Sequence, residues 1–452
     1  MEKLIVLGGG ESGVGAAILG KVKGYDVLVS DSGKIKDNYR EELKREGIAY
    51  EDGGHTESKV LAADLAIKSP GIPETAPLVV ALREKGVPVI SEIEFAGRYT
   101  KARKIGITGA NGKTTTTLLI HHILTECGVS ASLAGNVGFS MARQVAKGNE
   151  PDWYVIELSS FQLDDMFDFK CDIAILCNIT PDHMDRYDHS LANYAHAKYR
   201  ITQNMTESDV FIYNSDDLGT LTYFNNPEAT CLPVSLLNRS LYATCDGDLI
   251  DISFGPSADF SMAAQNLPIP GRHNIYNCMM AIAAVVAIGY VTEEELIIPT
   301  EDIKAALKTF RNAPHRLEPV RTLDGVEYIN DSKATNVDAA WYALEAQTKP
   351  VVWIAGGKDK GNDYSVLNDL CRSKVKALVC LGKDNTKLLE CFKGVIDTIV
   401  DTHDIGTCVA ECRRLASSGD VVLLSPCCAS FDLFTSYENR GDLFRETVNK
   451  LQ

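Results

Sequence analysis

The sequence predicts an α/β protein with three domains. With 452 residues, the chain is too long for a single hydrophobic core, since domains usually contain about 100 to 200 residues. Short apolar runs alternate with longer helical patterns from end to end, which is typical of parallel sheets. Three of these runs, at residues 4–7, 105–107 and 351–354, lead directly into glycine loops. Each third of the chain therefore starts with a strand, a glycine loop and a helix.

Further central strands are expected at residues 153–158, 173–178 and 210–214, each followed by polar residues. In parallel α/β proteins, ligands usually bind at these carboxyl ends of strands. Residues 218–270 are irregular and strand-like, and the pattern there predicts no function beyond an insertion or a lid. Breaks near residues 99–101 and 311–314 predict domains at residues 1–99, 100–312 and 313–452.

Charge and composition restrict the possible partners. Lys and Arg total 45 against 61 Asp and Glu, and the net charge of -16 opposes binding to nucleic acid. The longest apolar stretch, near residues 278–290, falls short of the roughly 20 residues that cross a bilayer. The 13 cysteines lie in apolar surroundings and suit reduced core thiols. We therefore expect a cytoplasmic protein without membrane insertion.

The second glycine loop has the composition of a phosphate-binding loop. Backbone N–H groups can converge on a phosphate there, while Lys113 supplies a charge and Thr114 can bind Mg²⁺. A strict P-loop would have glycine where Ile107 stands, so an ordinary glycine turn is the competing interpretation. The candidate loop consists of Thr108, Gly109, Ala110, Asn111, Gly112, Lys113 and Thr114.

The first glycine loop matches a dinucleotide fingerprint. Gly8, Gly10 and Gly13 follow a strand, and Asp31 ends the next strand 18 residues after Gly13. This pattern is compatible with an NAD site, a UDP-sugar site or tight packing of helix against strand. The loop by itself does not decide among them.

Three further polar residues follow predicted strands or lie just beyond them. Glu157 closes one strand, and a single carboxylate with Thr114 is sufficient protein ligation for a phosphate-bound Mg²⁺. His183 lies in a polar cluster after the next strand and is either a ligand or a structural histidine. Lys198 has the position of an ordinary solvated lysine on a helix.

Four segments together resemble the Mur ligases, especially the members that add D-glutamate. They are residues 108–114, Glu157-Leu-Ser-Ser-Phe-Gln-Leu163, Asp182-His-Met-Asp-Arg186 and Asn330-Asp-Ser-Lys-Ala-Thr-Asn336. The resemblance implies a Rossmann-like N-terminal domain, a P-loop-type ATP-binding central domain and a Rossmann-like C-terminal domain. It also implies an enzyme of peptidoglycan synthesis, in which ATP phosphorylates the carboxylate of UDP-N-acetylmuramoyl-L-alanine and D-glutamate attacks the acyl phosphate.

The same resemblance implies the catalytic and ATP-binding residues. The catalytic residues would be Lys113, Glu157, His183 and a carbamylated Lys198. Lys113 would neutralise charge on the transferring phosphoryl group, while Glu157, His183, the carbamylated Lys198 and Thr114 would hold two Mg²⁺ ions. Besides the phosphate loop, the expected ATP contacts are Asn274, Asn277, Arg316 and Asp331.

The remaining implied residues bind the two substrates. The expected UDP-substrate contacts are Glu11, Ser12, Asp31, Ser32, Pro70, Gly71 and Asn136, while Gly33 stands where an arginine can occur in the family. The expected D-glutamate contacts are His183, Lys333, Thr335, Lys360, Ser430 and Tyr437, with Lys358 as the alternative to Lys360. We expect these small molecules to be the only partners of a monomeric protein.

Three alternatives remain. Another Mur-type or folylpolyglutamate-type ligase would share the phosphate loop, and a non-catalytic UDP-sugar-binding protein would not need the metal-binding residues. An NAD-dependent dehydrogenase would explain the first glycine loop but not Lys113 or Glu157.

Overall fold

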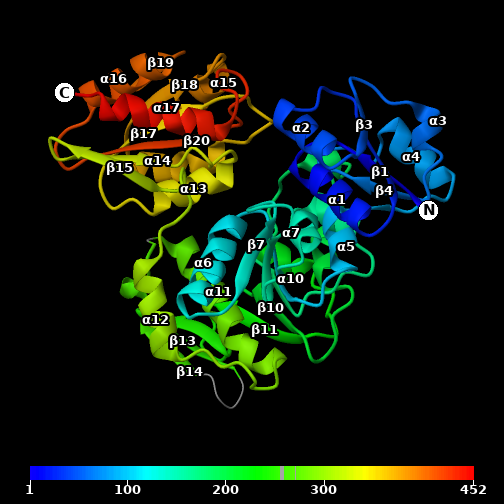
Figure 1. Ribbon diagram of the computed structural model, residues 1–452. Helices are drawn as coiled ribbons and strands as arrows, with labels where there is room; N and C mark the ends of the chain where they lie inside the picture. Colours follow the sequence, from blue (N-terminus) through cyan, green and yellow to red (C-terminus); the bar gives the residue numbers. More distant parts are fainter. Residues whose placement is uncertain (255–258, 270) are drawn as a thin grey trace. The chain divides into compact units, whose positions relative to one another are not determined.

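The computed structural model describes residues 1–254, 259–269 and 271–452, and it contains three sheets flanked by helices (Figure 1). The predicted α/β class with three sheet-containing domains is confirmed. By internal contacts the chain divides into two compact units. One unit is Met1–Leu267 with Tyr276–Phe310, and the other is Pro268–Ile275 with Arg311–Gln452. The three domain boundaries remain a prediction.

The first sheet is entirely parallel, with strand order β3-β2-β1-β4-β5. Its central strand β1 is buried at residues 4–7, the apolar run that predicted a strand here. The strands are β1 Lys3–Leu7, β2 Asp26–Asp31, β3 Ala49–Asp52, β4 Leu65–Lys68 and β5 Val89–Ile90. The helices are α1 Glu11–Val22, α2 Asp37–Arg45, α3 Glu57–Val60, α4 Pro77–Glu84 and α5 Glu92–Gly97.

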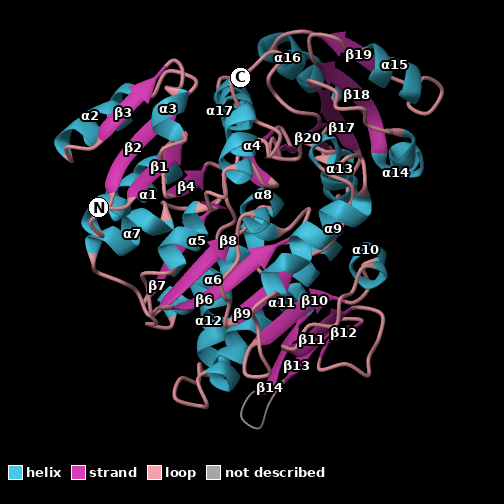
Figure 2. Ribbon diagram, turned by 90° about the vertical axis from the view of Figure 1, so that its right-hand side faces the viewer, coloured by secondary structure: helices cyan, strands magenta, loops and turns pink. Residues whose placement is uncertain are grey.

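The second sheet has nine strands in the order β14-β13-β12-β11-β10-β9-β6-β8-β7, and Figure 2 shows it with its helices. Its strands are β6 Arg103–Thr108, β7 Ala131–Gly135, β8 Trp153–Glu157, β9 Ile173–Leu176, β10 Val210–Asn214, β11 Thr230–Ser235, β12 Ala243–Asp246, β13 Leu249–Ser253 and β14 Asp259–Ala263. Its helices are α6 Lys113–Glu126, α7 Met141–Lys147, α8 Ser160–Asp164, α9 Leu191–Tyr199, α10 Leu218–Thr222, α11 Arg272–Val291 and α12 Thr300–Thr309. Short 3₁₀ turns occupy Met184–Arg186, Arg200–Thr202 and Ala264–Asn266.

The irregular stretch at residues 218–270 extends this second sheet. Strand β11 pairs parallel with β10, and β12, β13 and β14 follow as an antiparallel ribbon at the edge. Residues 255–258 and 270 of this stretch lie outside the described residues. The described part is therefore a continuation of the sheet, which the local pattern did not reveal.

Helix α11 is longer than the apolar stretch recognised in the sequence. It spans 20 residues with a mean hydropathy of 1.6, so length and composition would allow it to cross a membrane. However, 72% of its apolar window is buried inside the protein, which is how a core helix behaves. No other described helix has that length and composition.

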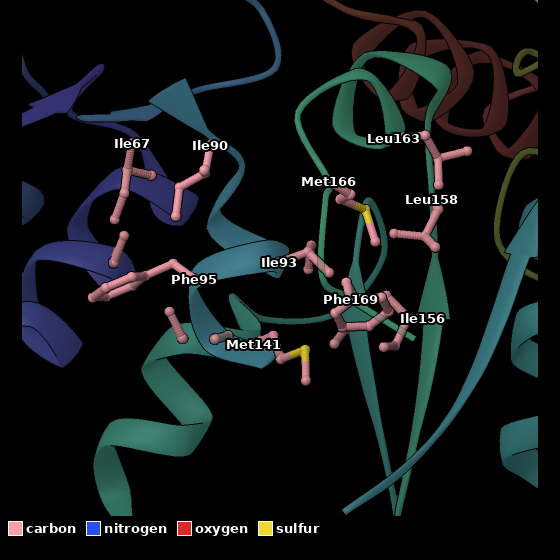
Figure 3. Packing of buried hydrophobic residues seen from close by; sticks show 14 of the residues in the cluster. Ile67, Ile90, Ile93, Phe95, Met141, Ile156, Leu158, Leu163, Met166 and Phe169 are labelled. Atoms are coloured by element: carbon pink, nitrogen blue, oxygen red, sulfur yellow. The ribbon is translucent and has the colours of Figure 1, made fainter. Parts of the chain in front are cut away.

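The first two sheets share one hydrophobic core. Phe95 and Ile93 of α5 pack in the same cluster as Met141 of α7 and Phe169 from the loop before β9 (Figure 3). Gly15 permits the close approach of α1 to α7, because a Cβ atom there would lie 2.0 Å from Ser140 Oγ. This continuous core explains why both sheets belong to one compact unit.

The third sheet has the order β15-β16-β20-β17-β18-β19, parallel except for β15. Two separate apolar clusters cover its two faces. The strands are β15 Glu318–Leu323, β16 Val326–Asn330, β17 Val351–Gly356, β18 Val375–Leu381, β19 Ile399–Thr402 and β20 Val421–Cys427. The helices are α13 Val337–Glu345, α14 Asn368–Lys374, α15 Thr386–Phe392, α16 Ile405–Leu415 and α17 Tyr437–Asn449, with a 3₁₀ turn at Ser365–Leu367.

Candidate functional site

The phosphate loop and Glu157 lie at the same edge of the second sheet. Strand β6 is hydrogen-bonded between β8 and β9, so the carboxyl ends of three parallel strands meet there. Ile107 is in register with Glu157, and the backbone N–H of Leu158 donates to the carbonyl oxygen of Ile107 at 2.8 Å. Sheet pairing therefore brings together residues that are about 50 positions apart in the chain.

Two glycines of the phosphate loop are required by their surroundings. Gly109 has φ +149°, and a Cβ atom there would lie 2.8 Å from the Cβ of Cys177. Gly112 has φ +88°, and a Cβ atom there would lie 2.3 Å from Asn277 Oδ1 on α11. Both conformations favour glycine, and helix α6 begins immediately after Gly112. The loop thus ends at a helix N-terminus, where backbone N–H groups can bind an anion.

Asn178, at the end of β9, holds the phosphate loop in place. Its carbonyl oxygen accepts from the N–H of Ala110 at 3.1 Å, and its Oδ1 accepts from the N–H of Asn111 at 2.9 Å. Its Nδ2 donates in return to the carbonyl oxygen of Asn111 at 3.1 Å. Sequence reasoning did not single out this residue, although a polar side chain directly after a buried strand was a usable signal.

Lys113 and Lys198 converge on one carbonyl oxygen. The ammonium groups of both residues donate to the oxygen of Gly109 at 2.8 Å, and Lys113 also donates to Ala110 O at 2.9 Å. Lys198 is only 1% exposed, and its Nζ lies 4.5 Å from the centre of the Tyr194 ring. Burial, helped by the charge of Lys113, holds the pKa of Lys198 well below its usual range. Lys198 is therefore not the solvated helical lysine that its position suggested.

Asn136 fixes the orientation of Glu157. Glu157 is 2% exposed, and its Oε1 accepts from Asn136 Nδ2 at 3.0 Å. The backbone N–H of Asn136 donates to the Glu157 carbonyl oxygen at 2.9 Å. Gly135, with φ +86°, allows this approach because a Cβ atom there would lie 2.2 Å from that oxygen. Asn136 was expected as a substrate contact, and the structure places it beside the candidate metal ligand.

The Ser-Ser-Phe-Gln segment has two structural roles. Ser159 and Gln162 form a capping box at the start of α8, which accounts for the serine and the glutamine. Phe161 makes an edge-on contact with the His183 ring at 5.1 Å between centroids, and the Arg186 guanidinium lies 4.3 Å from the Phe161 ring centre.

His183 remains accessible at this edge of the sheet. Its side chain is 45% exposed, its Nε2 lies 3.6 Å from Asp182 Oδ2, and its backbone is left-handed with φ 52°. Among the described residues, no three His, Cys, Asp or Glu side chains group closely enough to hold a metal ion on their own. A magnesium ion here would therefore need oxygen ligands from phosphate, hydroxyl or a modified side chain, which suits its usual preference.

Hydrogen bonds to the carboxylates of Asp31 and Glu11 hold the first glycine loop and its surroundings in place. Asp31 accepts from the N–H of Gly9 at 2.7 Å through one oxygen and from the N–H of Gly33 at 2.8 Å through the other. Glu11 accepts from Arg143 Nε at 2.9 Å and from Arg143 Nη2 at 3.0 Å. The carboxylates of Asp31 and Glu11, both expected to contact the UDP substrate, thus also support the fold.

The remaining expected UDP contacts surround this loop. Ser12 lies in the first turn of α1, Ser32 follows Asp31 at the end of β2, and Pro70 and Gly71 follow β4. These positions are the carboxyl ends of neighbouring strands β1, β2 and β4 and the helix after β1.

The Asn330–Asn336 segment follows β16 in the second compact unit, which also contains Asn274 and Arg316. Asp331 Oδ2 accepts from Ser425 Oγ at 2.9 Å, and its Oδ1 accepts from the N–H of Leu317 at 3.1 Å. Burial raises the pKa of Asp331 to about 7. Asn336 accepts from the N–H of Ala339 and caps α13.

Apart from His183, which follows β9 in the first compact unit, the residues expected to bind D-glutamate lie on segments after β16, β17 and β20 of the third sheet and at the start of α17. Lys333 Nζ lies 5.6 Å from the centre of the Tyr437 ring, and Ser430 is buried. Thr335 follows Lys333 in the same segment after β16. Lys358 and Lys360 are both exposed, and the N–H of Lys358 donates to the carbonyl oxygen of Ala429 at 2.8 Å, next to Ser430.

Arg440 is the clearest residue that sequence reasoning missed in this unit. It is 1% exposed and connects three strand ends by hydrogen bonds. Nothing in its local sequence distinguishes it from an arginine on the surface of a helix.

Comparisons with known proteins agree with this architecture. Residues 3–77 match the MurD N-terminal domain, residues 107–285 the Mur ligase middle domain, and residues 315–428 the Mur ligase, glutamate ligase domain. The chain is 49% identical over 454 residues to the UDP-N-acetylmuramoylalanine–D-glutamate ligase of Bacteroides fragilis, covering 100% of both chains. It is also 49% identical to the enzyme of that name from Cytophaga hutchinsonii, covering 100% of this chain and 99% of that one.

A solved structure shares the fold. The UDP-N-acetylmuramate–alanine ligase of Thermotoga maritima matches with a TM-score of 0.61 and 19% identity, over 99% of each chain. The full-length relatives and the matching domains place the chain in the Mur ligase family.

Proposed function

We propose that this protein joins D-glutamate to the carboxylate of UDP-N-acetylmuramoyl-L-alanine and converts ATP to ADP and phosphate, in the synthesis of peptidoglycan precursors. The observation that carries the proposal is the convergence of Lys113 and buried Lys198 on Gly109 O, with Glu157 at the end of the adjacent strand. The 49% identity to ligases of this name over the whole chain supports the same acceptor.

Lys113 is the group that we assign to the transferring phosphate. It now donates to two carbonyl oxygens of its own loop, so its ammonium group is already held over the loop. A nucleotide phosphate bound by the loop N–H groups would offer it a stronger, charged acceptor. Stabilising the charge on the transferring phosphoryl group is the main requirement of such a reaction.

Thr114, Glu157 and His183 are the residues that we assign to magnesium. When bound, Mg²⁺ would neutralise charge on the phosphate oxygens. Glu157 suits this role because Asn136 fixes its orientation through Oε1, and Thr114 lies in the first turn of α6. One or two protein oxygens are sufficient for Mg²⁺ when phosphates and water complete its shell.

Lys198 is proposed to carry a carbamate. Its lowered pKa favours the neutral amine, whose nitrogen can attack the carbon of CO₂ and lose a proton to solvent. A buried neutral amine would thereby become a carboxylate next to the phosphate loop. This group would support a second magnesium ion where the described residues offer no cluster of acids.

The substrates are assigned to the two compact units. The first glycine loop, with Asp31, Ser32 and Gly71, is proposed to hold the UDP group at the helix N-terminus of α1. Lys333 with Lys360 or Lys358 would pair with the two carboxylates of D-glutamate, since each offers a cation at a strand end of the third sheet. Asn274, Asn277, Arg316 and Asp331 are proposed ATP contacts.

A panel of acceptors tests this proposal. The purified protein would be given UDP-N-acetylmuramoyl-L-alanine, ATP, Mg²⁺ and one amino acid at a time, with phosphate release and product mass measured. D-glutamate should give the ligated product, while L-glutamate, D-alanine, L-lysine and meso-diaminopimelate should be poor acceptors. An acceptor without the side-chain carboxylate forms fewer ion pairs with the proposed lysines, and the wrong enantiomer misplaces the amine from the acyl phosphate. Faster product formation with L-lysine, L-alanine or meso-diaminopimelate would assign the chain to another ligation step.

A further inference from the structure

Arg440 is a buried cation without a carboxylate partner. It lies in the first turn of α17 and is 1% exposed. Its five side-chain hydrogen bonds all go to uncharged oxygens, and no described carboxylate lies within ion-pair distance of it. Burial lowers its pKa to about 10, so the guanidinium group is still charged at neutral pH. Burying a charge in this way is costly unless its hydrogen bonds are well placed.

The four acceptor oxygens of these five hydrogen bonds come from three different segments. Nε and Nη2 donate to Ser332 Oγ and Ser332 O at 2.9 and 2.8 Å, just after β16. Nη1 donates to Gly356 O at 3.4 Å, at the end of β17, and to Cys428 O at 3.2 Å, just after β20. Nη2 also donates to Cys428 O at 3.2 Å. One rigid, planar group therefore links the ends of three adjacent strands of the third sheet.

Each linked segment carries a residue that we assign to D-glutamate. Lys333 directly follows Ser332, Lys360 and its alternative Lys358 lie four and two residues after Gly356, and Ser430 is two residues after Cys428. Helix α17 itself begins at Tyr437, whose carbonyl oxygen accepts from Ser332 Oγ at 2.8 Å.

We infer that Arg440 is a positioning residue for the acceptor amino acid. Arg440 fixes the spacing of the segments that bind the two carboxylates of the acceptor, and it does not itself contact the acceptor. The inference rests on the proposed D-glutamate site. A dicarboxylate bound by two cations on separate segments requires those segments at a fixed distance, and small misplacements weaken such binding strongly. Asp331 accepts hydrogen bonds from Ser425 and Leu317, so the proposed nucleotide contact has hydrogen-bond partners other than Arg440.

The test compares Arg440→Lys and Ser332→Ala with Arg445→Gln as the control. Lysine keeps the charge but cannot span three segments, and Ser332→Ala removes one acceptor while leaving the arginine in place. Arg445 lies on the same helix and pairs with Glu318 and Asp442 at the surface. Steady-state KM values would be measured for D-glutamate, ATP and the UDP substrate, after circular dichroism has shown that each variant is folded.

We expect the KM for D-glutamate to rise by about tenfold or more in Arg440→Lys and by a few fold in Ser332→Ala, because the acceptor site loses its fixed spacing. The KM values for ATP and the UDP substrate should stay within about twofold, and Arg445→Gln should match the wild type. An unchanged KM for D-glutamate in folded Arg440→Lys, or an equal rise in all three KM values, would overturn the inference. If Arg440→Lys does not fold, Ser332→Ala decides, and a wild-type D-glutamate KM there overturns it. A wild-type protein that does not use D-glutamate at all would instead refute the proposed function.

Discussion

Lys113 and Lys198 share one acceptor oxygen but differ in their surroundings. Lys113 is half-buried at the start of α6, whereas Lys198 is enclosed and has a strongly lowered pKa. Burial disfavours the charged form of Lys198, and repulsion by the Lys113 ammonium group on the same carbonyl oxygen adds to this effect. The same geometry thus suits one lysine for binding phosphate and the other for chemical modification.

Replacing Lys113 by alanine should abolish phosphoryl transfer and leave the fold intact. A charge aimed at the transferring phosphate contributes several kcal/mol in the transition state and little to stability. We expect turnover to fall by about a hundredfold or more while the melting temperature changes little. The exposed Lys147, replaced by alanine in the same unit, serves as the control. A Lys113→Ala variant that retains more than about a tenth of wild-type turnover would refute the phosphate-loop assignment.

Replacing Lys198 by alanine should also remove nearly all activity. Short carboxylic acids should restore part of it, because they can occupy the vacated space and supply the missing carboxylate. They should not restore Lys113→Ala, which is the matched control. In the wild type, equilibrated with bicarbonate, crystallographic density should show the CO₂ adduct on Lys198. An unmodified lysine in an active sample would exclude the carbamate.

At the scale of elements, the junction of α5 and α7 contains a buried acid. Glu92 Oε1 accepts from Ser140 Oγ and from the N–H of Ala142, both at 2.6 Å, and burial raises the pKa of Glu92 to about 7. Glu11 nearby also raises this pKa, while Arg143 lowers it. The contact therefore joins the first two sheets through a group that titrates near neutral pH.

The Glu92 contact should make the first compact unit less stable as pH rises. The pKa of Glu92 in the folded protein is above its ordinary value of 4.5, so between pH 4.5 and 7 the folded state binds more protons than the unfolded state. The stabilisation that protonated Glu92 contributes is therefore fully present below pH 4.5 and is lost as the pH rises through 7. The loss amounts to about 3 kcal/mol by pH 8. Glu92→Gln should remove this loss, as measured by hydrogen exchange of the α5 and α7 peptides. An equally steep pH dependence in Glu92→Gln would show that another group is responsible.

Much of the fold could be predicted from the sequence because its strands are short apolar runs before glycine or polar residues. The runs at β1, β6, β8, β9 and β17 all became buried strands as expected. The position of β20 between β16 and β17 could not be predicted, because sheet order depends on pairings between distant segments. Residues 218–270 were recognised only as irregular and strand-like. The place of the described strands β11 to β14 in the second sheet could not be predicted, since it depends on the pairing of β11 with β10 and on the pairings that follow.

The candidate site was predictable where a residue directly follows a strand or a glycine loop. Lys113 and Glu157 have such positions, and the structure places them at one edge of the sheet. Lys198 and Arg440 lie on helices, and only tertiary packing shows that they are buried. Asn136 orients Glu157, and Asn178 holds the phosphate loop. Both roles depend on contacts between segments that are far apart in the sequence, so the sequence could not predict them.

The three sheets differ in how their cores are built. Residues 1–99 share a core with the second sheet, in which Phe95 and Ile93 pack in the cluster with Met141 and Phe169. The third sheet is covered by clusters drawn only from residues 317–451. Among the described residues, the clusters therefore indicate that the first two sheets depend on each other for their packing, whereas the third sheet is covered by its own residues.

The two ends of the chain should therefore behave differently when expressed alone. A fragment of residues 311–452 should fold, because both faces of its sheet are covered by its own residues. A fragment of residues 1–99 should be much less stable, because it would expose Phe95, Ile93 and the α1 surface at Gly15 that packs on α7. Exposing several large apolar side chains costs about 1.5 to 3 kcal/mol each, which is a large share of the stability of a domain of this size. Urea unfolding followed by circular dichroism would compare them, with residues 1–310 as the control that restores the shared core. A cooperative transition for residues 1–99 at the same urea concentration as for residues 1–310 would mean that the N-terminal sheet does not need this core.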